Sequence, residues 1–173
     1  MIVFILSFLI CFFSYYLHTL WHYQAYKGVD FRQRGSFFNV YTHFVVFTGY
    51  FAFGFMIFTD PLNINISIFL KIVGILIGLS GIIIGAIATI EKKGYAEPDH
   101  LITSGIYSKL RNPMYLGIIF IHVGLPLFFG SMITLLSALI WIPMIILWKH
   151  WEEKHLEKKF GEEYLIYKKT TLF

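Results

Sequence analysis

The sequence predicts an all-α integral membrane protein with about five transmembrane helices, and two observations lead to this class. Hydrophobic residues make up 57% of the 173-residue chain, its mean hydropathy is +0.69, and only 14% of its residues are charged. Because ordinary soluble domains are roughly 45–50% apolar, a soluble fold of this length would have no interior large enough for so much apolar surface. The apolar residues also form long uncharged runs that suit membrane-spanning helices. We therefore expect a single membrane domain over residues 1–173.

The first three spans are expected within residues 1–90. Residues 1–26 hold no charged side chain and lack the basic start and cleavage site of a signal peptide, so we expect a retained span. The second span is expected over residues 39–59 and the third over residues 68–90. The third span carries two GxxxG pairs, which predict close packing against another helix of this chain, with a dimer interface as the alternative. The glycines of these pairs are Gly74, Gly78, Gly81 and Gly85.

The uncharged run from Met114 to Trp148 predicts a helical hairpin rather than one long helix. As a single helix it would extend about 52 Å, whereas the hydrocarbon core of a bilayer is about 30 Å thick. Gly130-Ser131 lies near its midpoint and predicts a tight turn between two short helices. These helices are the fourth and fifth spans.

The residues that follow the hairpin predict a cytoplasmic amphipathic tail helix. One set recurs at helical spacing, with charged residues on the other faces: Trp148, Trp151, His155 and Leu156. Gly161 is expected to end this helix. Three residues beyond the glycine are expected on the membrane surface: Tyr164, Ile166 and Tyr167.

The basic residues predict the orientation of the chain. The loops at 27–38 and 91–112 and the tail from residue 149 hold every Lys and Arg except Lys71, including Arg32 and Arg34 of the first loop. Because basic loops remain in the cytoplasm, the N-terminus is expected outside and the C-terminus in the cytoplasm. All three polar segments then face one compartment, and the hairpin brings the stretch "GIYSKLRNPMYLG" (105–117) near residues 149–156.

This juxtaposition predicts a site at the cytoplasmic face. Arg111 offers a bidentate contact to a carboxylate, Glu152 and Glu153 can accept from an amine, and aromatic rings can stack on a flat ring or face a cation. Such a set suits a zwitterionic amino acid joined to a flat ring, and S-adenosylmethionine is such a molecule. From position and composition alone, interfacial anchoring of these residues remains the alternative. The aromatic residues are Tyr107, Tyr115, Trp148 and Trp151.

Two spaced motifs, "HLITSGIYSKLRNPMYLG" (100–117) and "EEKHLEKKFGEEYLIY" (152–167), resemble the isoprenylcysteine carboxyl methyltransferase and phospholipid methyltransferase superfamily. The first motif matches at Gly105, Tyr107, Arg111, Asn112, Pro113, Tyr115 and Gly117. The second matches at Glu152, Glu153, Leu156, Phe160, Gly161, Tyr164 and Tyr167. The resemblance covers roughly the C-terminal 75 residues and is closest to the small prokaryotic members.

The resemblance implies an S-adenosylmethionine-dependent methyltransferase of an inner (plasma) membrane, with its cofactor region in residues 91–173. It implies that membrane lipids and a lipophilic or prenylated acceptor are the partners, with no nucleic acid. The implied cofactor-binding residues are His100, Leu101, Tyr107, Arg111, Asn112, Pro113, Tyr115, Glu152 and Glu153. Asn112 stands where the eukaryotic prenylcysteine enzymes have His. The tail ends in "KKTTLF" without the arginine- or proline-bearing extension that many relatives carry, which leaves open the acceptor and any catalytic residue of that extension.

Two alternatives to a methyltransferase remain open. An NADPH-dependent sterol or isoprenoid reductase resembles the same region, but its typical R-x-P-N-Y-x-G motif followed by an acid is not matched, because Met114 and Ile118 stand at the discriminating positions. A membrane scaffold that kept the fold without the chemistry is the other.

The histidines leave the catalytic base unassigned. An amine or thiol acceptor would need to lose a proton, which His150, His155 or a glutamate can accept, whereas a carboxylate would not. His18 and His22, which share a helix face, and His43 are expected to bond to backbone or head groups rather than to a metal. His122 is expected to be buried and hydrogen-bonded. No metal site is expected, Cys11 has no partner for a disulfide, and the oligomeric state is left open.

Overall fold

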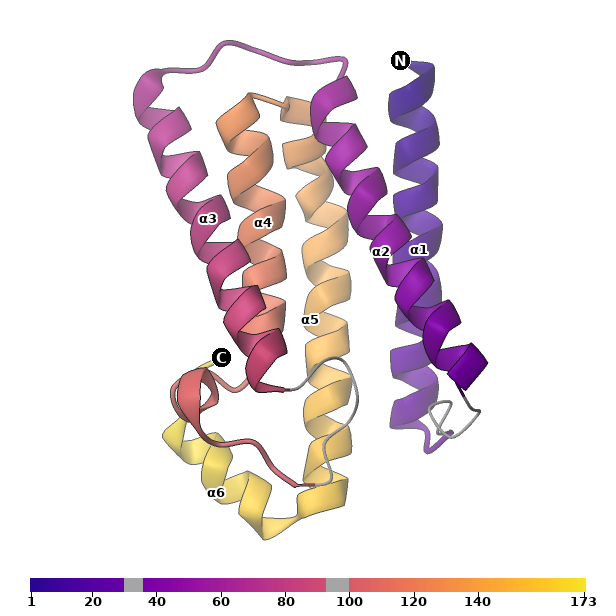
Figure 1. Cartoon of the computed structure of the whole chain (residues 1–173), viewed down its shortest axis with the longest axis vertical. Coiled ribbons are helices and arrows are strands. Elements are labelled where there is room, and N and C mark those ends of the chain that lie inside the picture. Colours follow the sequence, from indigo (N-terminus) through magenta and orange to yellow (C-terminus); the bar gives the residue numbers. More distant parts are fainter. Residues whose placement is uncertain (30–35, 93–99) are drawn as a thin grey trace.

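The computed structural model of the chain describes residues 1–29, 36–92 and 100–173. Within them, five long helices run side by side, and a short sixth helix folds back across one end (Figure 1). The long helices are α1 (Ile2–Tyr26), α2 (Ser36–Thr59), α3 (Ile68–Glu91), α4 (Pro113–Phe129) and α5 (Met132–Phe160). A 3-10 turn, η2 (Gly105–Ser108), precedes α4, and α6 (Glu162–Thr170) follows α5. The described residues form no β-strand.

The predicted all-α membrane class is confirmed. Among the described helices, α1, α2, α3 and α5 are long and apolar enough to cross a membrane, while α4 is a shorter apolar helix of 17 residues. The predicted hairpin turn is also present, because Gly130 adopts a left-handed φ of +73° between α4 and α5. Pro113 begins α4 at a position where its missing N–H leaves no hydrogen bond unmade.

The packing of α3 on α4 explains the glycines of the third span. A Cβ on Gly124 of α4 would lie 2.2 Å from the backbone nitrogen of Gly78, and one on Gly81 of α3 would lie 2.6 Å from the carbonyl oxygen of Gly117. Backbones this close leave no room for side chains, so the expected close packing within the chain is confirmed at these positions.

A buried aromatic cluster joins α1, α2, α4 and α5. Trp141 is fully buried, and its ring centroid lies 5.2 Å from that of Tyr15. The Tyr15 hydroxyl lies 2.8 Å from Nε2 of His122, whose Nδ1 lies 2.8 Å from the carbonyl oxygen of Ile118. Because that carbonyl only accepts, Nδ1 carries the proton and Tyr15 donates to Nε2. His122 is therefore buried and hydrogen-bonded, as the sequence predicted.

One end of the bundle, here called the connector end, consists of residues 60–67 and the turn 130–134. The Ile64 N–H donates to the Gly130 carbonyl at 2.9 Å, and the Met132 N–H donates to the Leu62 carbonyl at 3.1 Å. Asp60, which is buried, accepts from both the backbone N–H and the hydroxyl of Thr134 at 2.7 Å. The connector is thereby fastened to the hairpin turn by neutral donors.

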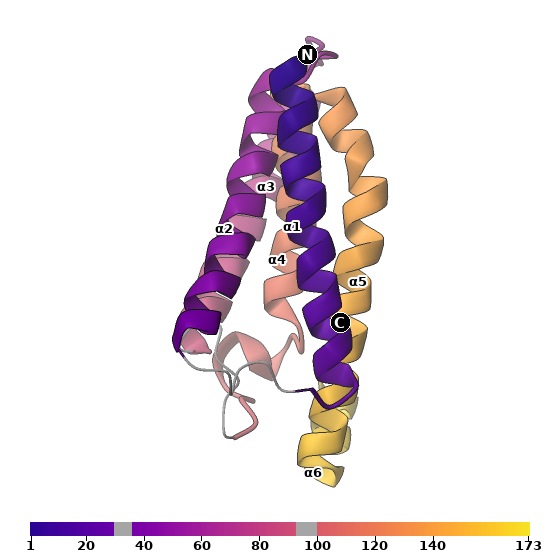
Figure 2. The ribbon, with the colours of Figure 1, turned by 90° about the vertical axis from the view of Figure 1, so that its right-hand side faces the viewer.

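The opposite end, here called the charged end, carries Lys92, Arg111, Lys149, Glu152, Glu153 and Lys168. The ends of α3 and α5, the start of α4 and the whole of α6 meet there (Figures 1 and 2). This arrangement agrees with the expected clustering of the basic segments. Arg32 and Arg34 of the first basic loop lie outside the described residues, as does the part of the second polar stretch at 93–99.

The tail differs from the sequence prediction in two respects. Its amphipathic helix is the last part of α5, which continues without a break from the span to Phe160. Gly161 ends that helix, as expected, with a φ of +54°, and the chain turns back as α6. Tyr164 and Tyr167 are only 1% and 7% exposed, so the expectation that they lie on the membrane surface is wrong: the fold-back turns them into the protein. Ile166 is exposed.

Candidate functional site

The carboxylate of Glu153 is the centre of the charged end. Its Oε1 accepts from Nδ2 of Asn112 at 2.6 Å and from Nε of Arg111 at 3.2 Å. Lys149 and Lys168 lie 3.3 and 3.4 Å from the same carboxylate. Its side chain is only 7% exposed, so these partners take the place of water. Three cations and one amide therefore hold one carboxylate.

Arg111 and Asn112 also fasten the last residues of the chain. A terminal nitrogen of Arg111 donates to the carbonyl oxygens of Lys168 and Thr171 at 2.9 and 2.5 Å. Nδ2 of Asn112 donates to the backbone oxygen of Phe173 at 2.8 Å. The segment that ends α6 thus packs against the residues that begin α4, and most donors of the R-N-P turn are used within the fold.

Glu152 forms a second, more open group. Its carboxylate accepts from the hydroxyl of Tyr115 and pairs with Lys92, whose Nζ lies 3.0 Å from Oε1. The Glu152 side chain is 20% exposed, against 7% for Glu153. The neighbouring glutamates therefore differ in accessibility, and Glu152 is the one that a ligand can reach more easily.

The turn before α4 is fixed by α3 and α6. The Ile106 N–H donates to Oε2 of Glu91 at 2.8 Å, at the end of α3. The hydroxyl of Tyr107 lies 3.4 Å from the Ala88 carbonyl, and the Tyr167 hydroxyl donates to the Tyr107 carbonyl at 2.7 Å. Burial raises the pKa of Tyr107 above its ordinary value and that of Tyr167 to about 12. Tyr107 is thus buried and stabilises the turn.

The structure brings together five of the nine predicted cofactor residues: Arg111, Asn112, Tyr115, Glu152 and Glu153. Pro113 adjoins them as the fully buried start of α4, and Tyr107 lies behind them. His100 is exposed and Leu101 half-buried, both next to residues outside the described ranges. Among the described residues, neither makes a hydrogen bond to the two glutamates.

Sequence reasoning missed the lysines that pair with the glutamates. Lys149 had a local signal, since it stands four residues before Glu153 on one helix face. Lys92 and Lys168 had none, because they reach the site only through the packing of α3 and the return of α6. Lys168 also lies 2.7 Å from Glu157, and this hydrogen bond raises the pKa of Lys168.

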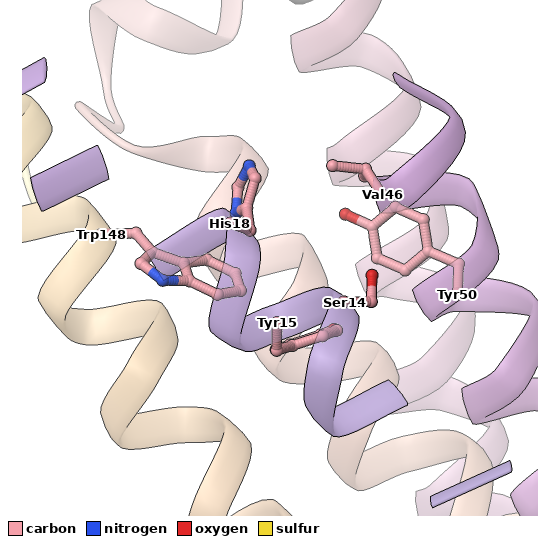
Figure 3. Close-up of a pocket in the computed structure, with 6 residues that line it drawn as sticks. All are labelled: Ser14, Tyr15, His18, Val46, Tyr50 and Trp148. Atoms are coloured by element: carbon pink, nitrogen blue, oxygen red, sulfur yellow. The ribbon is translucent and has the colours of Figure 1, made fainter. Parts of the chain in front are cut away.

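A small pocket adjoins the charged end, between α1, α2 and α5. His18 and Trp148 lie on one side of it and Val46 and Tyr50 on the other (Figure 3). Ser14 and Tyr15 complete its lining. The predicted pair His18 and His22 shares one helix face as expected, with ring centroids 4.6 Å apart.

The donors and acceptors of the charged end fit S-adenosylmethionine in their chemistry. The amino acid end of that molecule carries an ammonium, which suits the accessible carboxylate of Glu152, and a carboxylate, which suits Lys92 or Arg111. Tyr115, whose hydroxyl donates to Glu152, and Trp148, one helical turn before Glu152, are both buried beside this group. In the described part of the chain, no group of three or more His, Cys, Asp or Glu side chains is arranged to hold a metal ion.

A comparison with models of known protein families finds a match. The model of one family, described as phospholipid methyltransferase, matches residues 51–163, which is more than half of the chain. The matched region runs from the middle of α2 to the start of α6 and contains both glutamates and the R-N-P turn. No curated protein and no solved structure matches the chain.

Proposed function

The chain belongs to the phospholipid methyltransferase family, and from this premise we propose that it methylates a lipophilic acceptor at the cytoplasmic face, with S-adenosylmethionine as the donor. As a family member with several membrane-spanning helices it is a membrane methyltransferase. The donor, the acceptor and the side of the membrane are the parts that we propose.

One observation supports the proposal most strongly: the R-N-P turn contacts the Glu152-Glu153 pair directly. Asn112 and Glu153, which form a hydrogen bond, are 41 residues apart in the sequence. The two motifs that suggested the family in the sequence therefore make one group of side chains. A zwitterionic ligand needs opposite charges at a fixed separation, and such a group supplies them.

We assign different roles to the predicted cofactor residues. Glu152 and Lys92 contact the amino acid end of the donor, and Tyr115 orients Glu152 through its hydroxyl. Arg111, Asn112 and Glu153 hold α4, α5 and the end of α6 together beneath this group, and Arg111 adds positive charge toward the donor's carboxylate. Tyr107 and Pro113 fix the turn, and His100 and Leu101 border the site.

When bound, the donor supplies a methyl group that is carried on a sulfonium sulfur. After the transfer, the rest of the donor departs as a neutral thioether. The protein's contribution is then alignment and exclusion of water, which supply several kcal/mol of barrier reduction. The acceptor enters from the bilayer, since a site among apolar helices is accessible to lipids. The charged end lies in the cytoplasm, because basic segments remain on that side, and the N-terminus lies outside.

The test is the thermal stability of the detergent-purified protein with S-adenosylhomocysteine, with NADPH, and without ligand. A ligand at 100 times its dissociation constant stabilises by about 2.7 kcal/mol, or several degrees in melting temperature. We expect a shift with S-adenosylhomocysteine and none in Glu152→Ala, while Glu163→Ala on the exposed face of α6 keeps the shift. A shift with NADPH alone would favour a reductase, and no shift with either ligand would favour a scaffold.

A further inference from the structure

Two lysines from distant parts of the chain converge on one tyrosine ring where α1 and the last part of α5 lie side by side. Nζ of Lys158, near the end of α5, lies 4.6 Å from the centre of the Tyr26 ring and 3.3 Å from the Tyr26 carbonyl oxygen. Nζ of Lys27 lies 5.9 Å from the centre of the same ring. The last residue of α1 thus brings two ammonium groups to one place.

No carboxylate of the described residues neutralises this pair of lysines. Both side chains are exposed, and within residues 1–29, 36–92 and 100–173 neither forms an ion pair. The carboxylate of Glu157, which adjoins Lys158 in the sequence, is held by Lys154 and Lys168 at 2.8 and 2.7 Å. Two like charges against one ring repel each other, whereas an anion between them is attracted by both. The pair therefore suits an anionic ligand.

The pair lies at the depth of the lipid head groups. From Ile2 to Tyr26, α1 rises by about 36 Å, while the hydrocarbon core of a bilayer is about 30 Å thick. A helix that crosses the whole core thus brings its last residues to the level of the lipid phosphates. The rings of Tyr23 and Trp151, whose centroids are 5.4 Å apart, lie on the bilayer side of the lysines. Such aromatic residues are typical of the membrane interface.

Apolar faces of α1 and α5 continue from the lysines toward the middle of the bilayer. The two helices run side by side (Figure 2), and the contact between Tyr23 and Trp151 shows that these faces adjoin. Helical spacing places exposed residues of α1 below Lys27 and exposed residues of α5 below Lys158. These residues are Phe13, Tyr16 and Tyr23 of α1, and Ile140 and Leu147 of α5. The faces suit acyl chains as the lysines suit a phosphate.

We propose that an anionic phospholipid binds here, with its phosphate between Lys27 and Lys158 against the Tyr26 ring and its acyl chains along the two faces. A net negative head group such as that of phosphatidylglycerol fits better than a zwitterionic one, whose own ammonium the lysines repel. The bound lipid joins α1, which lies outside the family match at residues 51–163, to α5, which carries both glutamates. The inference goes beyond the proposed function, because no step of it involves the methyl donor or acceptor.

The first experiment compares two lipids on delipidated, detergent-purified protein. Phosphatidylglycerol should raise the melting temperature, whereas phosphatidylcholine with the same acyl chains should not. The double variant Lys27→Gln/Lys158→Gln should bind phosphatidylglycerol about 30-fold more weakly in a titration followed by native mass spectrometry, since each basic residue near an anionic surface contributes about fivefold. Replacement of both lysines by arginine keeps the charges and should preserve binding.

The matched control is Lys169→Gln, which removes one exposed lysine from α6 and should bind phosphatidylglycerol as the wild type does. Equal stabilisation by both lipids would overturn the proposal, because the acyl chains alone would then account for binding. A loss of affinity in Lys169→Gln as large as in the double variant would overturn it too. A melting shift with inorganic phosphate equal to that with phosphatidylglycerol would overturn the assignment of a lipid as the occupant.

The second experiment needs no variant. The wild-type protein is placed in nanodiscs that contain phosphatidylglycerol with a photoreactive diazirine in its acyl chain, and the labelled peptides are mapped by mass spectrometry. We expect more label on α1 and α5 than on α3, whose exposed face is equally apolar but whose neighbouring Lys92 is already paired with Glu152. Label spread evenly over the three helices would overturn the proposal.

Discussion

The two polar ends of the helix bundle satisfy their carboxylates in opposite ways. At the connector end, Asp60 is bound by a hydroxyl and backbone N–H groups, and the described residues place no cation on it. At the charged end, Glu153 is surrounded by Arg111, Lys149 and Lys168. Both carboxylates are buried, so the difference lies in their partners rather than in their depth.

This difference distinguishes contacts that only stabilise the fold from contacts that can also bind a ligand. Neutral donors in a tight turn hold a connector in place and leave little charge to attract a ligand. Paired charges from α3, α4, α5 and α6 can hold a fold and also present charge at an edge, as Glu152 and Lys92 do. The connector end is thus expected to matter for stability alone, and the charged end for stability and ligand binding.

The largest expected effect comes from Glu153→Ala. Removal of this carboxylate leaves three cations without their shared partner, and breaking a buried ion pair costs about 3–5 kcal/mol. We expect the free energy of unfolding to fall by about 3 kcal/mol and S-adenosylhomocysteine binding to be lost. Denaturant titration and calorimetry measure the two, with Glu163→Ala as the exposed control. An unchanged stability would contradict the central role of Glu153.

A smaller effect is expected from Asp60→Asn at the connector end. The amide has one oxygen where the carboxylate has two, so either Leu62 or Thr134 loses an acceptor for its N–H. A buried donor without a partner costs about 1–3 kcal/mol. Thermal unfolding should show this loss, while the affinity for S-adenosylhomocysteine stays at the wild-type value. A matching loss of affinity would remove the distinction between the two ends.

The variant Glu152→Gln should distinguish the role of Glu152 from that of its neighbour Glu153. Because Glu152 is partly exposed, the loss of its ion pair with Lys92 should cost about 1 kcal/mol or less. Its effect on S-adenosylhomocysteine affinity should nonetheless be at least about tenfold, since a charge-assisted contact contributes about 1.5–3 kcal/mol. A variant that binds as tightly as the wild type would move the donor contact away from Glu152.

A further effect is expected at alkaline pH, as a loss of stability confined to the charged end. Burial raises the pKa of Tyr167 from about 10 to about 12 in the folded protein. The folded state then holds a proton that the unfolded state has lost, so the stabilisation is complete below pH 10 and disappears as pH rises toward 12. Melting temperatures across this range should fall less steeply in Tyr167→Phe. Equal slopes would show that Tyr167 ionises as if exposed.

The sequence predicted the hairpin turn and the meeting of the R-N-P turn with the glutamate pair. These features depend on local signals, such as an uncharged run too long for one helix with a glycine near its midpoint. The position of Tyr164 and Tyr167 could not be predicted in the same way. It follows from the turn at Gly161, where φ is +54° and the chain reverses toward α4.

The sequence by itself determined the membrane class, the order of the helices and the end of the bundle at which the charges gather, because hydropathy and charge act along the chain. Only the tertiary structure decided which charges pair, with Lys92 on Glu152 and Lys168 on Glu153, and that His18 and His22 face Trp148. These pairings depend on the rotation of each helix about its own axis and on the return of α6. Packing between distant segments sets both, and no local pattern of residues encodes them.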